Sequence, residues 1–197
     1  NTPEELEILK RSFLSKNDNN EKAKLKTQID KSIQKLLPNG QFSTSVFFSE
    51  ILISGNGFDI LVANPPYGIV FDPVLKDLLE SRFPRFKRNN DIYVAFFEYG
   101  LGILLKNQGQ LVYISPNTYL NGDYFKKLRA FLTGVAEINE IRDYKEVPVF
   151  DDPTVFVCII SLTKNSSIKY PYKVIYYKAK ESITNFESSS FVVKTAS

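Results

Sequence analysis

The chain has 197 residues, 43% of them hydrophobic, and a net charge of +3, which is enough for one domain with a buried core. It contains no histidine and one cysteine, so a histidine-dependent nucleophile and an internal disulfide are excluded and a zinc site is disfavoured. No apolar run approaches membrane-spanning length and no signal-peptide pattern occurs, so we expect a cytoplasmic protein that does not bind a membrane.

The first 40 residues predict a helical hairpin. Thr2 followed by Pro3, Glu4 and Glu5 is typical of a helix start, and this helix should run to about Ser15. Four apolar residues then share one helical face before Pro38-Asn39-Gly40 ends the second helix: Leu25, Ile29, Ile33 and Leu36. We expect residues 1–40 to pack at the edge of the main domain, with partner binding as the alternative.

The next strong signal is an apolar run over 58–63, which predicts a parallel strand covered on both faces. Asn64-Pro65-Pro66-Tyr67 follows it directly. Two prolines fix the backbone, and the residue before a proline is held extended, so the Asn64 amide should be fixed at the strand end. The Asn64 side-chain oxygen and the Pro65 carbonyl can each accept one N–H, while Tyr67 can stack on a ring. This arrangement suits a flat ring that carries an exocyclic amino group.

Downstream, predicted helices alternate with strands. We expect helices over 71–79, 91–106 (capped by Asp91) and 123–132, and strands over 110–115, 137–144 and 154–163. This order predicts an open α/β sheet with crossover helices, and ligands of such sheets bind beyond the carboxyl ends of the strands. Residues 166–197 contain tyrosine-rich strand material with a serine-rich break at 188–190, and we expect them to lead out of the domain.

A basic loop is predicted between the first two of these helices. Over 81–90, four cations alternate with Phe83 and Phe86: Arg82, Arg85, Lys87 and Arg88. Basic residues mixed with aromatic residues suit a mobile loop that contacts DNA phosphates. A plain solvated loop fits the same composition.

Five sequence blocks together resemble a known family. They are Gly57–Val70 (similar to motif IV), Asp91–Glu98, Asn107–Leu120, Tyr124–Leu132 and Val149–Lys164 (similar to motif VIII). Their order and spacing resemble the N6-adenine DNA methyltransferases of the gamma class, especially those within type IIG restriction–modification enzymes. The resemblance covers roughly residues 40–164. It implies that 41–165 form the C-terminal half of a Rossmann-like, S-adenosylmethionine-dependent methyltransferase sheet.

The resemblance also implies a role for individual residues. Asn64 and the Pro65 carbonyl would accept the two N–H groups of a flipped-out adenine, and Tyr67 and Phe150 would stack on its faces. Pro66 and Phe96 match family positions that contact the cofactor. Double-stranded DNA would be the substrate, S-adenosylmethionine the methyl donor, and no metal would be required.

Each of these assignments has a structural alternative. Asn-Pro is a common turn dipeptide, and the assignment of Tyr67 depends on that of Asn64. Phe150 and Phe96 both lie in apolar surroundings where a phenylalanine is usually part of the core. The carboxylate pair Asp151 and Asp152 precedes Pro153 and fits a turn better than a catalytic pair.

The family's cofactor signature is a glycine-rich turn after the first strand, and this chain has none: Gly55-Asn56-Gly57 precedes a strand. With no initiating methionine, we expect a segment of a longer polypeptide. The resemblance implies an N-terminal nuclease and cofactor-binding half and a C-terminal target-recognition domain as its partners.

Two other functions remain open. Enzymes that methylate a glutamine amide in protein release factors, and some RNA methyltransferases, also carry Asn-Pro-Pro-Tyr and use the same acceptor pair. Alternatively, the segment is a non-catalytic DNA-binding remnant.

Overall fold

The computed structural model describes residues 2–39, 42–53, 55–87, 89–145, 147–150 and 155–194. The chain divides into two compact units, residues 1–58 and residues 59–197. Within the described residues, none of the helices combines the length and the apolar composition needed to cross a bilayer.

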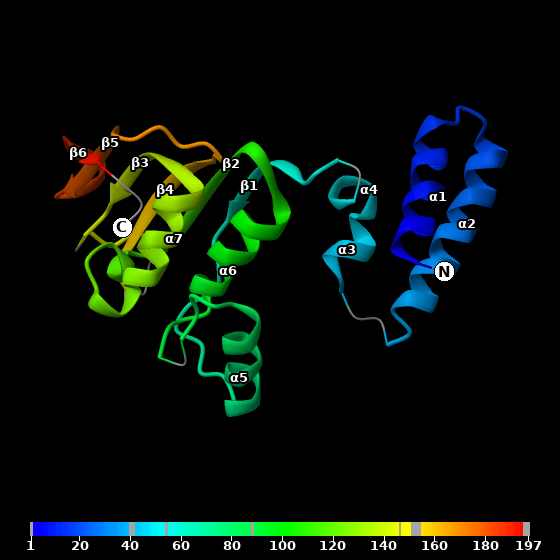
Figure 1. The fold of residues 1–197 in the computed structure, drawn as a ribbon, viewed down its shortest axis with the longest axis horizontal. Helices are drawn as coiled ribbons and strands as arrows, with labels where there is room; N and C mark the ends of the chain where they lie inside the picture. The colour runs from blue at the N-terminus through cyan, green and yellow to red at the C-terminus, as the bar shows by residue number, and fades with distance from the viewer. Residues whose placement is uncertain are drawn as a thin grey trace. The chain divides into compact units, whose positions relative to one another are not determined.

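The first unit is built on a helical hairpin. Helix α1 (Pro3–Ser15) begins with a capping box in which Thr2 and Glu5 bond each other's backbone N–H, as the sequence predicts. Helix α2 (Asn19–Leu36) begins where the Asp18 carboxylate accepts from the N–H of Glu21. The two helices lie side by side (Figure 1).

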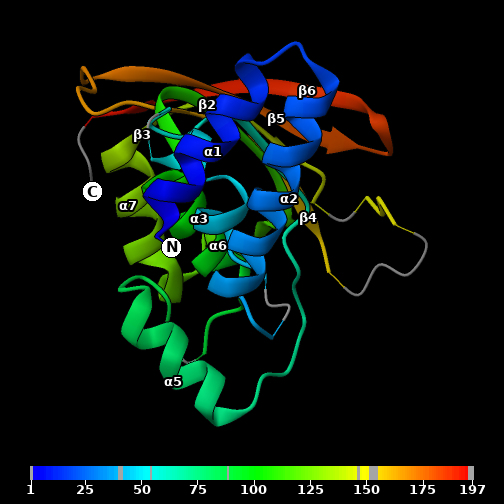
Figure 2. The ribbon, with the colours of Figure 1, turned by 90° about the vertical axis from the view of Figure 1, so that its right-hand side faces the viewer.

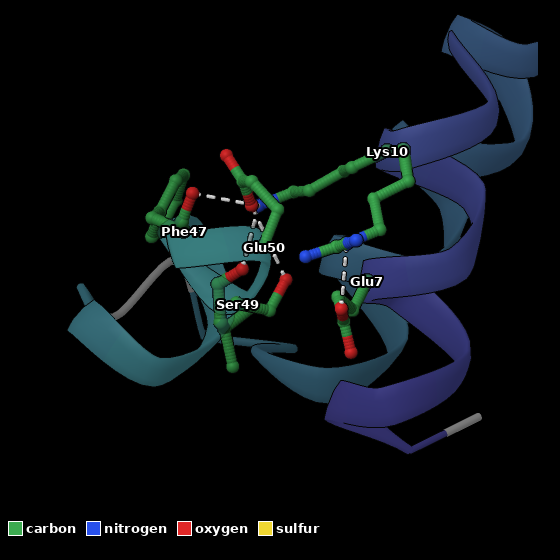
Figure 3. A network of polar contacts seen from close by, with 7 residues as sticks. Glu7, Lys10, Phe47, Ser49 and Glu50 are labelled. Atoms are coloured by element: carbon green, nitrogen blue, oxygen red, sulfur yellow. Dashed lines mark hydrogen bonds and ion pairs between the residues drawn. The ribbon is translucent and has the colours of Figure 1, made fainter. Parts of the chain in front are cut away.

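Two short helices that the sequence analysis did not predict complete this unit: α3 (Thr44–Phe47) and α4 (Ser49–Leu52). Lys10 of α1 joins them (Figure 3). Its ammonium group donates to the carbonyls of Val46 and Phe47 at 2.9 and 2.6 Å and pairs with Glu50 at 2.9 Å. A cation at the carboxyl end of a helix satisfies carbonyls that have no partner within the helix, so Lys10 ties α1 to the end of α3.

The second unit is built on a six-stranded sheet with the order β1-β2-β4-β3-β5-β6. The strands are β1 (Phe58–Ala63), β2 (Leu105–Pro116), β3 (Ala136–Asp143), β4 (Val157–Lys164), β5 (Tyr172–Lys180) and β6 (Ser182–Val193). Strand β4 runs antiparallel to both β2 and β3, and β5 runs parallel to β3. Strands β2, β3 and β5 therefore share one direction, and their carboxyl ends lie at the same edge. This mixed α/β sheet confirms the predicted fold class.

The core lies on one face of the sheet. Helices α6 (Tyr93–Tyr99) and α7 (Lys126–Val135) contribute buried side chains that meet those of β2, β3 and β4, such as Phe97, Leu128 and Ile160. Helix α5 (Pro73–Arg82) lies beyond α6, away from the sheet, in both ribbon views (Figures 1 and 2). It contacts the core through Leu75 and Leu79.

The predicted helix over 91–106 is shorter in the structure. Helix α6 ends at Tyr99, a π-helical turn covers Gly100–Leu104, and β2 begins at Leu105. A Cβ atom on Gly100 would lie 2.6 Å from the Tyr113 hydroxyl, so a larger residue here would force the buried Tyr113 side chain of β2 to shift. The buried Leu105 then begins the strand, five residues earlier than the sequence suggested.

Two further expectations about strands are corrected. Strand β1 is at the end of the sheet, and Ile60 and Val62 are 62% and 74% exposed, so it is not covered on both faces by this chain. The serine-rich stretch 188–190 does not break the chain. It lies inside β6, where it pairs with Ile175, Tyr176 and Tyr177 of β5, because the ladder of backbone hydrogen bonds outweighs the low strand propensity of serine.

Phe86 allows a test of this core. It is fully buried, whereas Phe96 on α6 is 36% exposed. We expect Phe86→Ala to lower the free energy of unfolding by about 3–5 kcal/mol, because it removes a whole ring from a packed site. Urea denaturation followed by circular dichroism measures the change. Phe96→Ala is the matched control, and equal losses from both variants would contradict this description of the core.

Candidate functional site

The turn after β1 presents one polar group beside a fixed backbone. Asn64 is exposed, Pro65 is buried, Pro66 is exposed and Tyr67 is partly buried. The burial of Pro65 holds the peptide units on either side of it, since its φ angle is fixed by the ring and its side chain is enclosed. The side-chain oxygen of Asn64 and the carbonyl of Pro65 are therefore acceptors supplied by one rigid segment.

Tyr67 connects this turn to the rest of the unit. It packs against the main core and also against a second hydrophobic cluster formed by Tyr144, Val157 and Ala179. Val147 and Val149, which come shortly before Phe150, pack against this second cluster as well. The structure thus brings the turn after β1 and the connection between β3 and β4 to the same hydrophobic cluster.

Asp91 binds the end of this turn through its side chain. One carboxylate oxygen accepts from the N–H of Gly68 at 2.6 Å, and the other accepts from the N–H of Ile92 at 2.7 Å. Gly68 has a φ of +69°, a left-handed conformation that glycine adopts without strain. From the sequence, Asp91 is expected only as the cap of the following helix. In the structure, α6 begins at Tyr93 without a side-chain cap, and Asp91 instead joins the end of the Asn64–Tyr67 turn to the start of α6.

Phe96 is exposed on a helix whose other large side chains are not. Its exposed fraction is 36%, whereas Tyr93 and Phe97 on the same helix are 1% and 0% exposed. A core phenylalanine would be enclosed like its neighbours. Its ring is thus accessible to a bound molecule, and the assignment of Phe96 to the cofactor stays a prediction.

Phe150 is likewise partly exposed, at 42%, in the connection between β3 and β4. This exposure disfavours the core alternative for the residue. The neighbouring carboxylates Asp151 and Asp152 lie outside the described residues, so the choice between a turn and a carboxylate pair stays open.

The basic segment 81–90 differs from the mobile loop that the sequence predicts. Phe86 is fully buried, and Glu98 of α6 accepts from the N–H groups of Arg85 and Phe86 at 2.7 and 3.0 Å. The Arg85 guanidinium lies 3.6 Å from the Glu98 carboxylate and 4.7 Å from the centroid of the Phe131 ring. The segment is therefore anchored to the core.

The burial of Glu98 shifts its pKa. Burial raises the pKa of its carboxyl above the ordinary value of 4.5, against the opposing effect of the two N–H groups and the Arg85 charge. Arg85 thus has a structural role. Arg82 and Lys87 are exposed and remain candidates for phosphate contacts, and Arg88 lies outside the described residues.

The described residues provide neither a cysteine nucleophile nor a metal site. Cys158 is fully buried, and burial raises the pKa of its thiol to about 12, so it is not a thiolate nucleophile at neutral pH. The part of the chain that the structure describes holds no cluster of three metal-ligating side chains. A cavity of about 450 Å³ lies among α7, β3 and the end of β6, and none of the predicted site residues lines it.

Comparison with known proteins identifies the family to which the chain is similar. The model of the Eco57I restriction-modification methylase family matches residues 1–150. The chain is 30% identical over 182 residues to a protein of Methanocaldococcus jannaschii named as a predicted type II restriction enzyme and methyltransferase, covering 90% of this chain and 15% of that protein. It is 28% identical over 120 residues to the type II restriction enzyme and methyltransferase RM.Eco57I of Escherichia coli, covering 58% of this chain and 12% of that protein.

The fold is also shared with a solved structure. A modification subunit of a predicted type I restriction enzyme from Vibrio vulnificus matches with a TM-score of 0.50 and 18% identity, over 64% of this chain and 27% of that one. The chain spans only 15% and 12% of the two relatives in sequence, so it corresponds to a small part of each. Since the family model matches most of its length, the chain belongs to the Eco57I restriction-modification methylase family.

Proposed function

We propose that this chain is the target-base half of a DNA methyltransferase that methylates the N6 amino group of a flipped-out adenine, within a longer type IIG restriction–modification enzyme. Membership of the family and the names of the relatives support methyl transfer to DNA. The choice of an amino nitrogen on adenine is carried by one observation, the exposed Asn64 amide beside the buried Pro65.

The two acceptors of this turn address the chemical difficulty of the reaction. The lone pair of an adenine amino nitrogen is delocalised into the ring, which makes the nitrogen a poor nucleophile. When Asn64 and the Pro65 carbonyl each accept one N–H, they favour tetrahedral geometry at the nitrogen and localise its lone pair. Because both acceptors belong to one rigid turn, little reorganisation is needed as positive charge develops on the nitrogen.

Aromatic side chains would hold the base in this position. Tyr67 is partly buried and immobilised by both hydrophobic clusters, so its ring is a pre-oriented surface for stacking. Phe150 would approach the base from the connection between β3 and β4. Stacking on an aromatic ring contributes about 1–3 kcal/mol per base, which offsets part of the cost of unstacking the adenine from the duplex.

S-adenosylmethionine, when bound, supplies the methyl group for an in-line displacement. The residues present fit part of its site, because Phe96 has an exposed ring and Pro66, which directly follows Pro65, is exposed as well, so both can offer apolar contacts. We propose that the rest of the cofactor site lies in a preceding part of the parent polypeptide, and that base readout lies in a following recognition domain.

The first test is Asn64→Ala in the full-length parent enzyme. The enzyme is incubated with unmethylated DNA and S-adenosylmethionine, and the DNA is digested to nucleosides for mass spectrometry. We expect wild type to form N6-methyladenosine and the variant to form it at least about 100-fold more slowly, because a preorganised acceptor is lost. Asn20→Ala, at an exposed position of α2, controls for the amide-to-methyl change. A wild type that methylates a protein glutamine or an RNA, and no DNA base, would refute the proposal.

A second test concerns the support of the turn. Asp91→Ala removes the acceptor for the Gly68 N–H and should lower kcat about 10-fold through misplacement of Asn64 and Tyr67, while Asp91→Asn keeps an acceptor oxygen and should restore most of the rate. Asp72→Ala is the matched control, because this carboxylate also accepts a backbone N–H, that of Leu75 at the start of α5. Equal rates for Asp91→Ala and Asp72→Ala would contradict a positioning role.

A third test concerns DNA phosphates. Replacing both Arg82 and Lys87 with Ala should weaken DNA binding and reduce the slope of log affinity against log salt concentration by about 2, roughly one per lost phosphate contact. Lys169 and Lys173 form the control pair, since both are exposed. Lys173 lies near the amino end of β5, at the edge of the sheet opposite to the carboxyl ends of β2, β3 and β5. An unchanged salt slope in the Arg82 and Lys87 variant would show that these cations do not meet the DNA backbone.

A further inference from the structure

A buried carboxylate at the end of β3 collects three hydrogen bonds. Asp143 is the last residue of this strand and is 4% exposed. One of its oxygens accepts from the side-chain amide of Asn117 at 2.9 Å and from the N–H of Lys145 at 3.0 Å. The other accepts from the hydroxyl of Tyr176 on β5 at 2.5 Å. Asp143, the end of β3, is thereby joined to Asn117, which directly follows β2, and to Tyr176 in the middle of β5.

Two of these residues, Asp143 and Asn117, also bind the ends of the connection between β3 and β4, residues 144–156. At its start, the N–H of Tyr144 donates to the carbonyl of Val157 at 3.1 Å, next to the bond from Lys145 to Asp143. At its end, the backbone N–H of Asn117 donates to the carbonyl of Phe156 at 3.0 Å. Asn117 thus makes two contacts: its backbone N–H binds the end of the connection, and its side-chain amide binds Asp143.

This connection carries Phe150, the predicted partner of Tyr67 in stacking on the target base. Its residues Val147 and Val149 pack against the cluster that contains Tyr144 and Val157, and Tyr67 packs against that cluster too. The contacts at the two ends of the connection, together with the packing of Val147 and Val149, therefore constrain the position of Phe150.

A buried carboxylate is costly unless hydrogen bonds replace the water that it loses, and an apolar side chain of similar size would pack here at lower cost. Burial and the neighbouring Asp143 raise the pKa of the Tyr176 phenol, so its hydroxyl remains a proton donor at neutral pH. Hydrogen bonds are directional, whereas apolar contacts are not. They can therefore fix the orientation of a segment, and a ring that stacks on a base must be held in one orientation.

We propose that Asp143, together with Asn117 and Tyr176, is a positioning unit that holds the two ends of the connection between β3 and β4 and so directs Phe150 toward the flipped base. This inference rests on the proposed function, because Phe150 has a base to meet only if the enzyme flips one. None of the three residues touches the reacting atoms in this scheme, and their effect passes through Phe150.

The test uses the full-length parent enzyme and Tyr176→Phe, which removes one hydroxyl and keeps the ring. We expect kcat for DNA methylation to fall about 10- to 100-fold, because small displacements of a positioning group are costly, while KM for S-adenosylmethionine stays within about twofold. Asp143→Asn should have a similar effect. Tyr177→Phe is the matched control. This neighbouring tyrosine has its ring under the Arg142 guanidinium at 5.0 Å, a contact that phenylalanine retains.

A double-mutant cycle with Phe150→Ala separates positioning from a general loss of stability. If Tyr176 acts through Phe150, Tyr176→Phe should cost little further activity once the Phe150 ring is gone. Additive losses, or a Tyr176→Phe rate equal to that of Tyr177→Phe, would overturn the inference even where wild type methylates DNA normally. A wild type that binds DNA but forms no methylated adenine would instead remove the proposed function, and this inference with it.

Discussion

The antiparallel insertion of β4 between β2 and β3 is the constraint on which the site depends. Because β4 opposes both neighbours, β2 and β3 run in one direction and end at one edge of the sheet. That edge is where Asn117 follows β2 and Asp143 ends β3. The connection that leads into β4 must begin and end at this edge as well, so its aromatic residue Phe150 is delivered there by topology alone. Ligand sites of open α/β sheets occur at such edges for the same reason.

The parts of the fold that the sequence predicts are those with local causes. The capping box of α1 involves residues three apart, and β1 is an apolar run that ends before two prolines, so the positions of both elements were predicted correctly. Helices α3 and α4 have four residues each and carry no periodic signal that a sequence can reveal. The serine stretch inside β6 and the early start of β2 depend on pairing and packing with distant segments, and these overrode local propensity.

The same division holds within the candidate site. Asn64, Pro65 and Tyr67 are adjacent in the chain, so their arrangement follows from proline stereochemistry and could be predicted. Asp91 contacts Gly68, 23 residues away, and Asp143 contacts Asn117, 26 residues away. No local pattern in the sequence reveals either of these long-range contacts. The anchoring of the basic segment by Glu98 was missed for the same reason, since its acceptor role appears only once α6 is packed.

Exposure alone does not identify the aromatic residues that are predicted to contact the base and the cofactor. Phe96 and Phe150 are exposed to 36% and 42%, but Val62 on β1 and Val74 on α5 are exposed to 74% and 77%. An apolar side chain costs free energy in water wherever it lies, so exposure does not by itself mark a binding residue.

What sets the candidate site apart is that several independent contacts hold its backbone in place. Asn64 precedes a buried proline, Tyr67 packs against two clusters, Gly68 is held by a carboxylate, and Phe150 lies between two fixed strand ends. Rigid support of this kind lowers the reorganisation needed when a partner molecule arrives, which is the physical requirement of a preorganised site.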